Sequence, residues 1–281
     1  MTHENQEQEM TFWDHLDELR KVIFRIVIAV SLLAVVAFIN KTLLFDIIFA
    51  PHRSDFITYR VLCTLGTHLQ MPSICPGEFH VDLINTQLAS QLMAHMSVAF
   101  YTGLVVASPY IIYQLFGFIK PALYENERRY STRTILAAFV LFFCGLLLNY
   151  YAIFPLSFRF LGTYQVSEFV ENKITLSSYI STFTTLSIAM GAVFEIPILA
   201  FFFAKTGLVK THHLKKYRRH AFVVILIISA ILTPADLFSL FLLAIPMYML
   251  YELSILVVKR TSPKTPHTME ESPKENSRGE E

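Results

Sequence analysis

The sequence predicts an all-α membrane protein with six transmembrane helices, the last two short, and with the N and C termini in the cytoplasm. Of the 281 residues, 54% are hydrophobic and 16% are charged, whereas soluble domains contain about 25% charged residues. Apolar runs long enough to span the ~30 Å hydrocarbon core recur along the chain. Lys and Arg residues concentrate in alternate connections between these runs. The net charge of +1 gives no indication of nucleic-acid binding.

Residues 1–21 are predicted to form a cytoplasmic N-terminal segment. Thr11 and Asp14 have the T-x-x-D spacing of a helix capping box, and an apolar stripe at helical spacing runs from Phe12 to Ile23. We expect an amphipathic helix at the inner membrane surface that runs into the first span. The alternative is a plain juxtamembrane helix with a solvated acidic face. The segment lacks the basic start of a secretory signal peptide, so the first apolar run should stay as an anchor.

Residues 22–258 are predicted to form the transmembrane domain. Its four long apolar runs lie near 22–39, 93–117, 134–155 and 179–204. The next run, 221–232, would rise only about 18 Å as a helix, and Pro234 ends it. A last apolar run contains Pro246 and Glu252. We expect two short helices in a hairpin that either crosses or re-enters the membrane.

The basic residues orient these spans. Most of the 23 Lys and Arg residues fall in the N-terminal segment, in the connections after the second and fourth spans, and in the C-terminal tail. The residues on the other side are Lys41, Arg53, Arg60, Arg159 and Lys173. By the positive-inside rule, both termini are expected in the cytoplasm.

Two further segments flank the spans. The connection at about 40–92 is expected outside the cytoplasm, and its length predicts some structure of its own. It contains Cys63 and Cys75, which can form a disulfide only in an oxidising compartment. Residues 259–281 are polar and charged and are predicted to be a disordered cytoplasmic tail.

Prolines interrupt or end several of the predicted helices. Pro109 lies inside the second span, where it either bends the helix or is simply tolerated. Pro121 is expected to end that helix, and Pro234 to end the short fifth one. Asp236 follows this second break and is placed to cap the last helix.

Two acids stand out by their surroundings. Glu195 lies near the middle of the apolar stretch SIAMGAVFEIPILAFFF, where an unpaired carboxylate costs at least about 2.5 kcal/mol. It is either a functional group or a protonated structural side chain that bonds a neighbouring helix. Glu127 precedes Arg128 and Arg129. It either pairs with these arginines at the surface or presents a carboxylate to an incoming guanidinium group.

An ordered set of motifs from about residue 14 to 255 resembles the TatC family of twin-arginine protein translocases. The motifs are HLDELR, SPYIIYQLFGFIKPALYENERR, FPLSF, FEIP, YRRHAFV, LTPADLFS and AIPMYMLYE. The resemblance implies a concave, cup-shaped bundle of six helices in the bacterial inner membrane. It also implies a receptor for twin-arginine signal peptides that moves folded proteins with TatA-type and TatB-type single-span partners, uses the proton-motive force and self-associates.

The resemblance assigns roles to individual residues. By position, Glu18 and Glu127 form the signal-peptide site, and Leu19 and Arg20 support it. Glu195 is implied to contact a polar group of a partner's membrane helix. Pro51 matches a proline of the family, although the first outside loop is longer than is typical of the family.

The residues also allow two alternative functions. A proton-coupled secondary transporter would use Glu195 as its proton site, and an intramembrane hydrolase would use Glu195, Asp236 or a His. The sequence contains no CxxC pair, Walker loop or HExxH motif, so we expect no metal, no cofactor and no enzymatic activity.

Overall fold

A computed structural model describes residues 12–68, 70, 81–119, 131–165, 167, 169, 172–205, 207, 209–234 and 236–261. The α-helices are α1 (Phe12–Ile39), α2 (Lys41–Phe49), α3 (Ile57–His68), α4 (Ser90–Ile119), α5 (Ser131–Leu148), α6 (Phe154–Thr163), α7 (Leu176–Phe194), α8 (Ile196–Lys205), α9 (Thr211–Lys216), α10 (Arg218–Leu232) and α11 (Leu237–Thr261). A 3₁₀ turn, η1 (Ala50–His52), follows α2, and a π-helix, η5 (Asn149–Ile153), joins α5 to α6. Two short strands are β1 (Leu83–Ile84) and β2 (Ile174–Thr175).

Within these described residues, 5 segments are long and apolar enough to cross a membrane. They are His15–Ile39, Ser90–Phe118, Thr134–Thr163, Leu176–Lys205 and Leu237–Thr261. The first four contain the four long spans predicted from the sequence. α10 is short as predicted, because its 15 residues rise only about 22 Å. Whether α10 makes a sixth crossing stays a prediction.

The prediction that the last helix is short is wrong, since α11 has 25 residues. The helix continues through Pro246, which removes only one backbone hydrogen bond. Leu243 and Met247, on either side of this proline, are buried in the core. Their packing holds α11 together across the missing bond.

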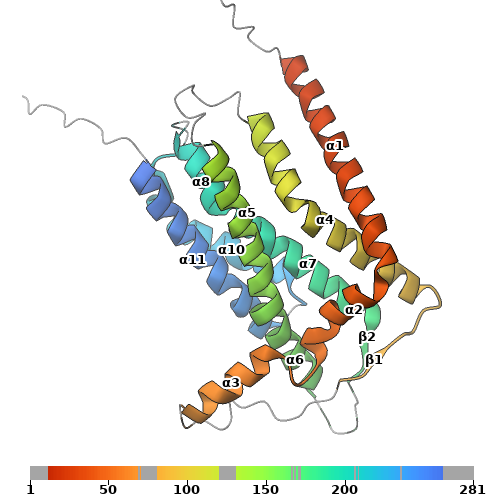
Figure 1. Cartoon of the computed structure of the whole chain (residues 1–281). Coiled ribbons are helices and arrows are strands. Elements are labelled where there is room, and N and C mark those ends of the chain that lie inside the picture. Colours follow the sequence, from red (N-terminus) through yellow and green to blue (C-terminus); the bar gives the residue numbers. More distant parts are fainter. Residues whose placement is uncertain are drawn as a thin grey trace, which may run out of the picture.

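α1 is a single helix of 28 residues. It contains no Gly or Pro, and its length of about 42 Å exceeds the ~30 Å hydrocarbon core. Residues 12–21 of the predicted N-terminal segment are therefore continuous with the first span along one axis (Figure 1). The amphipathic position of this segment at the inner membrane surface stays a prediction.

α1 and α4 run antiparallel and in close contact (Figure 1). At their crossing, Gly103 lies so close to α1 that an added Cβ would be 2.7 Å from Ala34 N and 2.8 Å from Val30 O. Glycine is therefore required at this position by the neighbouring backbone. Pro109 lies farther along α4 and is tolerated inside the helix.

On the side away from α1, α4 packs against α5 and α7, and α8, α10 and α11 lie beyond these two helices (Figure 1). The core lies mainly between α4, α7, η5 and α11. Aromatic rings fill the part of the core next to α6 and the start of α7. Tyr179 of α7 packs edge-on against Phe154 and Phe158 of α6, with ring centroids 5.0 and 5.1 Å apart. Asn149 is completely buried and donates from Nδ2 to Ser187 Oγ at 2.7 Å.

The long connection at about 40–92, which is predicted to lie outside the cytoplasm, has structure of its own in its described residues, as the sequence predicted. It contains α2, η1, α3 and β1. Strand β1 pairs in parallel with β2, with Leu83 opposite Ile174 and Ile84 opposite Thr175. This pairing joins two connections that lie far apart in the sequence.

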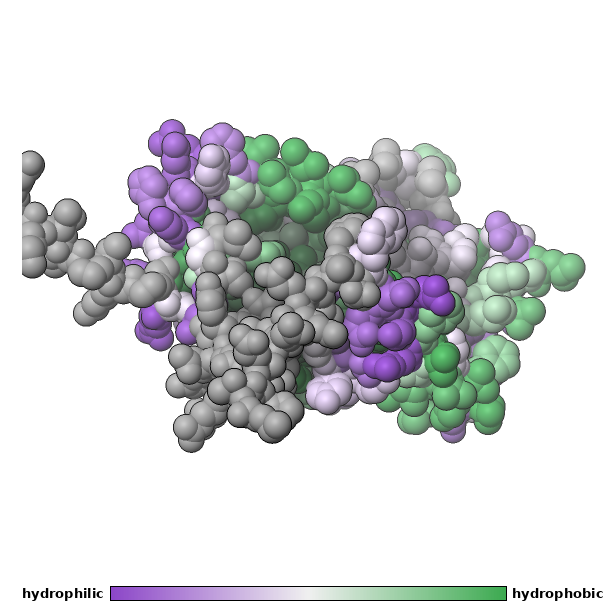
Figure 2. All heavy atoms as spheres, turned by 90° about the horizontal axis from the view of Figure 1, so that it is seen from above, coloured by the Kyte–Doolittle hydropathy of each residue, from purple (hydrophilic) through white to green (hydrophobic). Residues whose placement is uncertain are grey.

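The basic residues of the bundle lie more at one of its ends than at the other. The start of α1 and the ends of α4, α8 and α11 lie at one end, whereas α2, α3 and the two strands lie at the other (Figure 1). The first end carries the basic residues of α1, α8, α9 and α11. Figure 2 looks onto this end and shows hydrophilic side chains gathered there among apolar ones. The described ends of the chain, Phe12 and Thr261, thus lie on the same side of the bundle, and its cytoplasmic orientation remains a prediction.

Candidate functional site

The first turns of α1 carry the predicted motif residues Glu18, Leu19 and Arg20. Glu18 Oε2 lies 3.3 Å from Lys21 Nζ, and the two side chains are 44% and 61% exposed. An exposed pair at this spacing contributes little to stability. The carboxylate of Glu18 is therefore held on a regular helix and is free to exchange Lys21 for another cation.

The start of α1 is packed against the end of α4. The ring of His15 stacks on Phe118, with centroids 4.3 Å apart and planes at 25°. His15 and Glu18 are three residues apart and so lie on neighbouring positions of the same helix. The stack therefore fixes where Glu18 lies relative to the end of α4.

The other predicted signal-site residue, Glu127, lies outside the described residues, as does Pro121. Both belong to the connection that starts directly after α4 ends at Ile119. The structure thus brings Glu18 close to the start of the connection that carries Glu127.

Glu195 is the single residue between α7 and α8. Its backbone N–H donates to Ala192 O at 3.1 Å, and its own carbonyl accepts from Leu199 N at 2.9 Å. Pro197 follows in the first turn of α8 and cannot donate to the preceding turn, which explains the break in the helix. Among the described residues, the buried Oε1 of Glu195 has no hydrogen-bond partner. This carboxyl oxygen can still accept or donate a bond to a polar group from outside the chain.

Comparison with known proteins identifies the family. A family model described as Sec-independent protein translocase protein (TatC) matches residues 14–246. The chain belongs to the TatC family. It is accordingly a component of a protein translocase and a multi-pass protein of the inner membrane.

Curated relatives and a solved structure agree with this assignment. The chain is 37% identical over 256 residues to the Sec-independent protein translocase protein TatC of Blattabacterium sp. subsp. Periplaneta americana, covering 90% of this chain and 96% of the relative. It is 35% identical over 249 residues to the Campylobacter jejuni TatC, covering 89% and 94%. The crystal structure of a twin-arginine translocase receptor, TatC, is similar with a TM-score of 0.71 and 29% identity, and the match covers 88% of this chain and 99% of that one.

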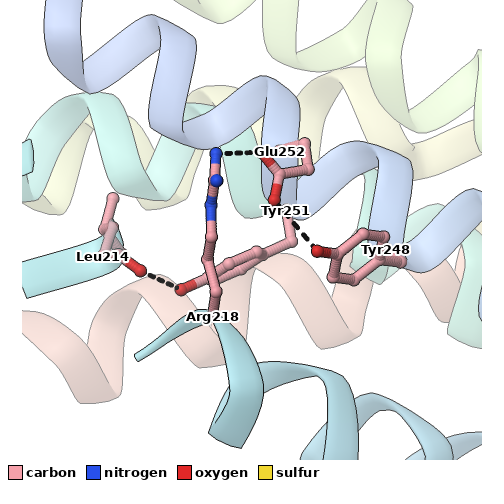
Figure 3. A network of polar contacts seen from close by, with 5 residues as sticks. All are labelled: Leu214, Arg218, Tyr248, Tyr251 and Glu252. Carbon is pink, nitrogen blue, oxygen red and sulfur yellow. Dashed lines mark hydrogen bonds and ion pairs between the residues drawn. The ribbon is translucent and has the colours of Figure 1, made fainter. Parts of the chain in front are cut away.

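This TatC protein also contains a polar cluster that was not predicted from the sequence, and Figure 3 shows it. Arg218, at the start of α10, lies 2.6 Å from Glu252 Oε2 of α11. Tyr248 donates to Glu252 Oε1 at 3.1 Å, and Tyr251 donates to Leu214 O at 2.8 Å. These bonds tie α9 and α10 to α11 near the end that carries the basic residues. Glu252 is the one acid of an apolar run, and that signal could have pointed to a cation from another helix.

Of the residues predicted to have structural roles, Pro51 lies in η1, and Pro234 and Asp236 lie in the break before α11. Pro51 is buried in η1, and its carbonyl accepts from Tyr59 Oη at 3.1 Å. Asp236 Oδ2 accepts from Ser239 N at 2.7 Å, which is the N-cap bond of α11, and Pro234 lies in the break before it.

The two described cysteines differ in oxidation state. Cys63 is disulfide-bonded, and Cys144 is free. Cys75 lies outside the described residues, so the Cys63–Cys75 pairing stays a prediction.

Proposed function

We propose that this TatC protein is the receptor for twin-arginine signal peptides, and that Glu18 and Glu127 bind the two arginines. The observation that carries this proposal is the exposed carboxylate of Glu18, held by the His15–Phe118 stack near the connection that contains Glu127. Leu19 and Arg20 flank this carboxylate on α1 and support the peptide around it.

The chemistry of the site favours arginine over lysine. A guanidinium group can donate two parallel hydrogen bonds to one carboxylate, whereas an ammonium group acts as a point charge. Two carboxylates on separate elements can each take one arginine. A peptide with two lysines keeps the charge but loses the paired geometry.

Further parts of the proposal concern the complex. Glu195 would bind a polar group in the membrane helix of a TatA-type or TatB-type partner, and its buried Oε1 supports this role. The assembly would contain several copies of this chain and would move folded proteins with the proton-motive force. The chain itself would act as receptor and core subunit and would catalyse no reaction.

The experiment that tests the receptor function is direct peptide binding. The purified full chain is titrated with a labelled signal peptide in Arg-Arg and Lys-Lys forms. We expect clear preference for Arg-Arg, and loss of that preference in Glu18→Gln and Glu127→Gln. Asp17→Asn is the matched control, because Asp17 is an exposed neighbour of Glu18 on α1.

Equal binding of the two peptides would contradict the proposal, since a general acidic patch does not distinguish the two cations. An equal loss of binding in Asp17→Asn would also contradict it, because net charge would then explain the effect of Glu18→Gln.

A further inference from the structure

α3 lies outside the candidate spans and projects sideways from the outer end of the bundle, across the direction of the long helices (Figure 1). It is anchored to the span Thr134–Thr163 at two depths. The hydroxyl of Thr58 donates to the carbonyl of Tyr151, and Tyr59 Oη donates to Pro155 O at 2.9 Å. These bonds hold α3 at a defined level against the outer part of that span.

This level is close to the membrane surface. Tyr151 lies 17 residues beyond Thr134, or about 26 Å along the helix, near the far edge of the ~30 Å hydrocarbon core. The side chain of Tyr151 is 45% exposed and that of Tyr164, directly after α6, is 63% exposed. Exposed tyrosines are typical of the boundary between lipid and water. α3 is therefore held at the outer boundary of the bilayer.

The surface of α3 divides into three stripes. Tyr59 and Gly66 are buried against the bundle. The polar stripe consists of Arg60, Thr64 and Thr67, which are exposed. The apolar stripe consists of Ile57, Val61 and Leu65, which are 55%, 52% and 50% exposed. Since its members follow at i, i+4 and i+8, the apolar stripe is continuous from Ile57 to Leu65, and the exposed His68 follows it in the last turn.

The apolar stripe lies on the bilayer side of α3. Thr58 reaches Tyr151 O, whereas Tyr59 reaches Pro155 O, one turn farther out along the span. The Thr58 side of α3 is therefore the side that faces into the membrane. On a helical wheel, the centre of the apolar stripe lies about 60° from Thr58, and the polar stripe lies about 90° beyond it on the other side.

We propose that α3 is an interfacial membrane helix, and that its apolar stripe inserts into the outer leaflet between headgroups and acyl chains. The partner is the lipid surface itself, because Thr58, beside the stripe, bonds the span at Tyr151 O, and this span exposes Tyr151 and Phe143. The polar stripe then faces the headgroups and water, as in other amphipathic helices that lie in the interface. This role fixes the depth of the outer loop and does not depend on the proposed receptor function.

The test is lipid contact of the full chain in phospholipid nanodiscs. Single cysteines replace Val61, Leu65 or Thr64 in a Cys144→Ser background, without reductant because Cys63 is disulfide-bonded. Each cysteine carries an environment-sensitive fluorophore, and the quencher is a phospholipid brominated high on its acyl chains. We expect several-fold stronger quenching in Val61→Cys and Leu65→Cys than in Thr64→Cys. Thr64 is the matched control because it is exposed on the polar stripe of the same helix.

Two outcomes would overturn the proposal. Equally weak quenching at Val61 and Thr64 would mean that the apolar stripe lies in water, and equally strong quenching would mean that α3 is buried in lipid on both faces and is not interfacial. Blue-shifted emission at Val61 without quenching by the brominated lipid would mean that protein, such as a second copy of this chain, covers the stripe. Because all the substituted residues are exposed, failure to fold is not expected, and monodisperse elution of each variant checks this.

Discussion

At the scale of single residues, the sequence left the role of Glu195 open between a functional carboxylate and a structural one. A structural glutamate in a membrane helix would bond a neighbouring helix, but among the described residues its buried Oε1 has no partner. Its position at the break between α7 and α8 is also set by Pro197 and does not require the carboxylate. These observations favour a role for Glu195 in binding a polar group of another molecule.

A first prediction follows for Glu195. Replacing it by Met removes a buried oxygen whose missing hydrogen bond costs about 1–3 kcal/mol and keeps a similar volume. We expect Glu195→Met to leave the thermal unfolding temperature of the purified chain unchanged or higher. The comparison is Tyr179→Phe, which removes the bond from the buried Tyr179 Oη to Ile48 O and should lower that temperature. A large loss of stability in Glu195→Met would show that the carboxyl group is structural.

A second prediction concerns His15. Because its ring stacks on Phe118, His15→Ala should free the start of α1 and weaken Arg-Arg peptide binding by up to about tenfold. His15→Phe keeps an aromatic ring and should restore most of the affinity. Spin labels at Asp17 and Leu115, both exposed, should show a broader distance distribution in His15→Ala. If His15→Phe binds as weakly as His15→Ala, stacking is not the reason.

At the scale of helices, distant side chains replace the hydrogen bonds that prolines remove. Pro155 has no N–H to donate to the carbonyl of Tyr151, one turn earlier. That carbonyl instead accepts from the hydroxyl of Thr58. Similarly, the carbonyls at the end of α2 accept from tyrosines, Ile47 O from Tyr150 at 2.8 Å and Ile48 O from Tyr179 at 2.7 Å. The outer loop is thereby bonded to the spans through backbone groups.

Tyr59 contributes to the same set of bonds. Its hydroxyl is buried, and this burial raises the pKa of Tyr59 well above its ordinary value, although the charge of Arg159 acts in the opposite direction. The hydroxyl therefore remains protonated at physiological pH. Its single proton can be shared between Pro51 O and Pro155 O throughout that range.

A third prediction tests the packing of α1 against α4. An Ala at Gly103 would place its Cβ 2.7 Å from Ala34 N, and such overpacking costs about 1–3 kcal/mol. Gly117 is the control in the same helix, since an added Cβ there meets nothing within 4 Å and Ala favours the helix by about 1 kcal/mol. We expect Gly103→Ala to lower the unfolding temperature and Gly117→Ala to leave it equal or higher. The reverse order would contradict the close approach.

At the scale of the whole molecule, the bundle is held at both ends by contacts between segments distant in sequence. At the outer end, β1 pairs with β2, and Gly162 of α6 lies so close to Val81 that an added Cβ would be 2.9 Å from its Cγ2. At the other end, the Arg218–Glu252 pair joins α10 to α11. The partly exposed pair gives little stability by itself, but with the tyrosines it fixes the direction in which α10 enters the bundle.

A fourth prediction tests the path of α10. If its 15 residues complete a crossing, then single cysteines at Tyr217 and Leu237, which are 52% and 74% exposed, must lie on opposite sides of the membrane. In a Cys144→Ser background, a membrane-impermeant maleimide should label Leu237→Cys in intact cells and Tyr217→Cys only in inverted vesicles. Labelling of both from the same side would mean that α10 and α11 form a re-entrant hairpin.

The long spans, the short α10 and a structured outer loop were all predictable from the sequence. Each depends on local quantities, namely the length of an apolar run, a proline or a loop too long to be featureless. The length of α11 was not predictable, because tolerance of Pro246 depends on the neighbours of Leu243 and Met247. For the candidate site, residue type and surroundings pointed to Glu195 and Glu127, whereas only the resemblance to the TatC family pointed to Glu18. The sequence missed the His15–Phe118 stack and the partner of Glu252.

The sequence by itself determined that this chain is a membrane protein of the TatC type and where its apolar segments and carboxylates lie. Hydropathy, charge bias and motifs are properties of contiguous residues, so folding is not needed to read them. Only the tertiary structure decided which segments meet: α1 with α4, β1 with β2, Thr58 with Tyr151 and Arg218 with Glu252. These contacts join residues far apart in the chain, and they form because packed helices bring unsatisfied backbone and charged groups within bonding distance.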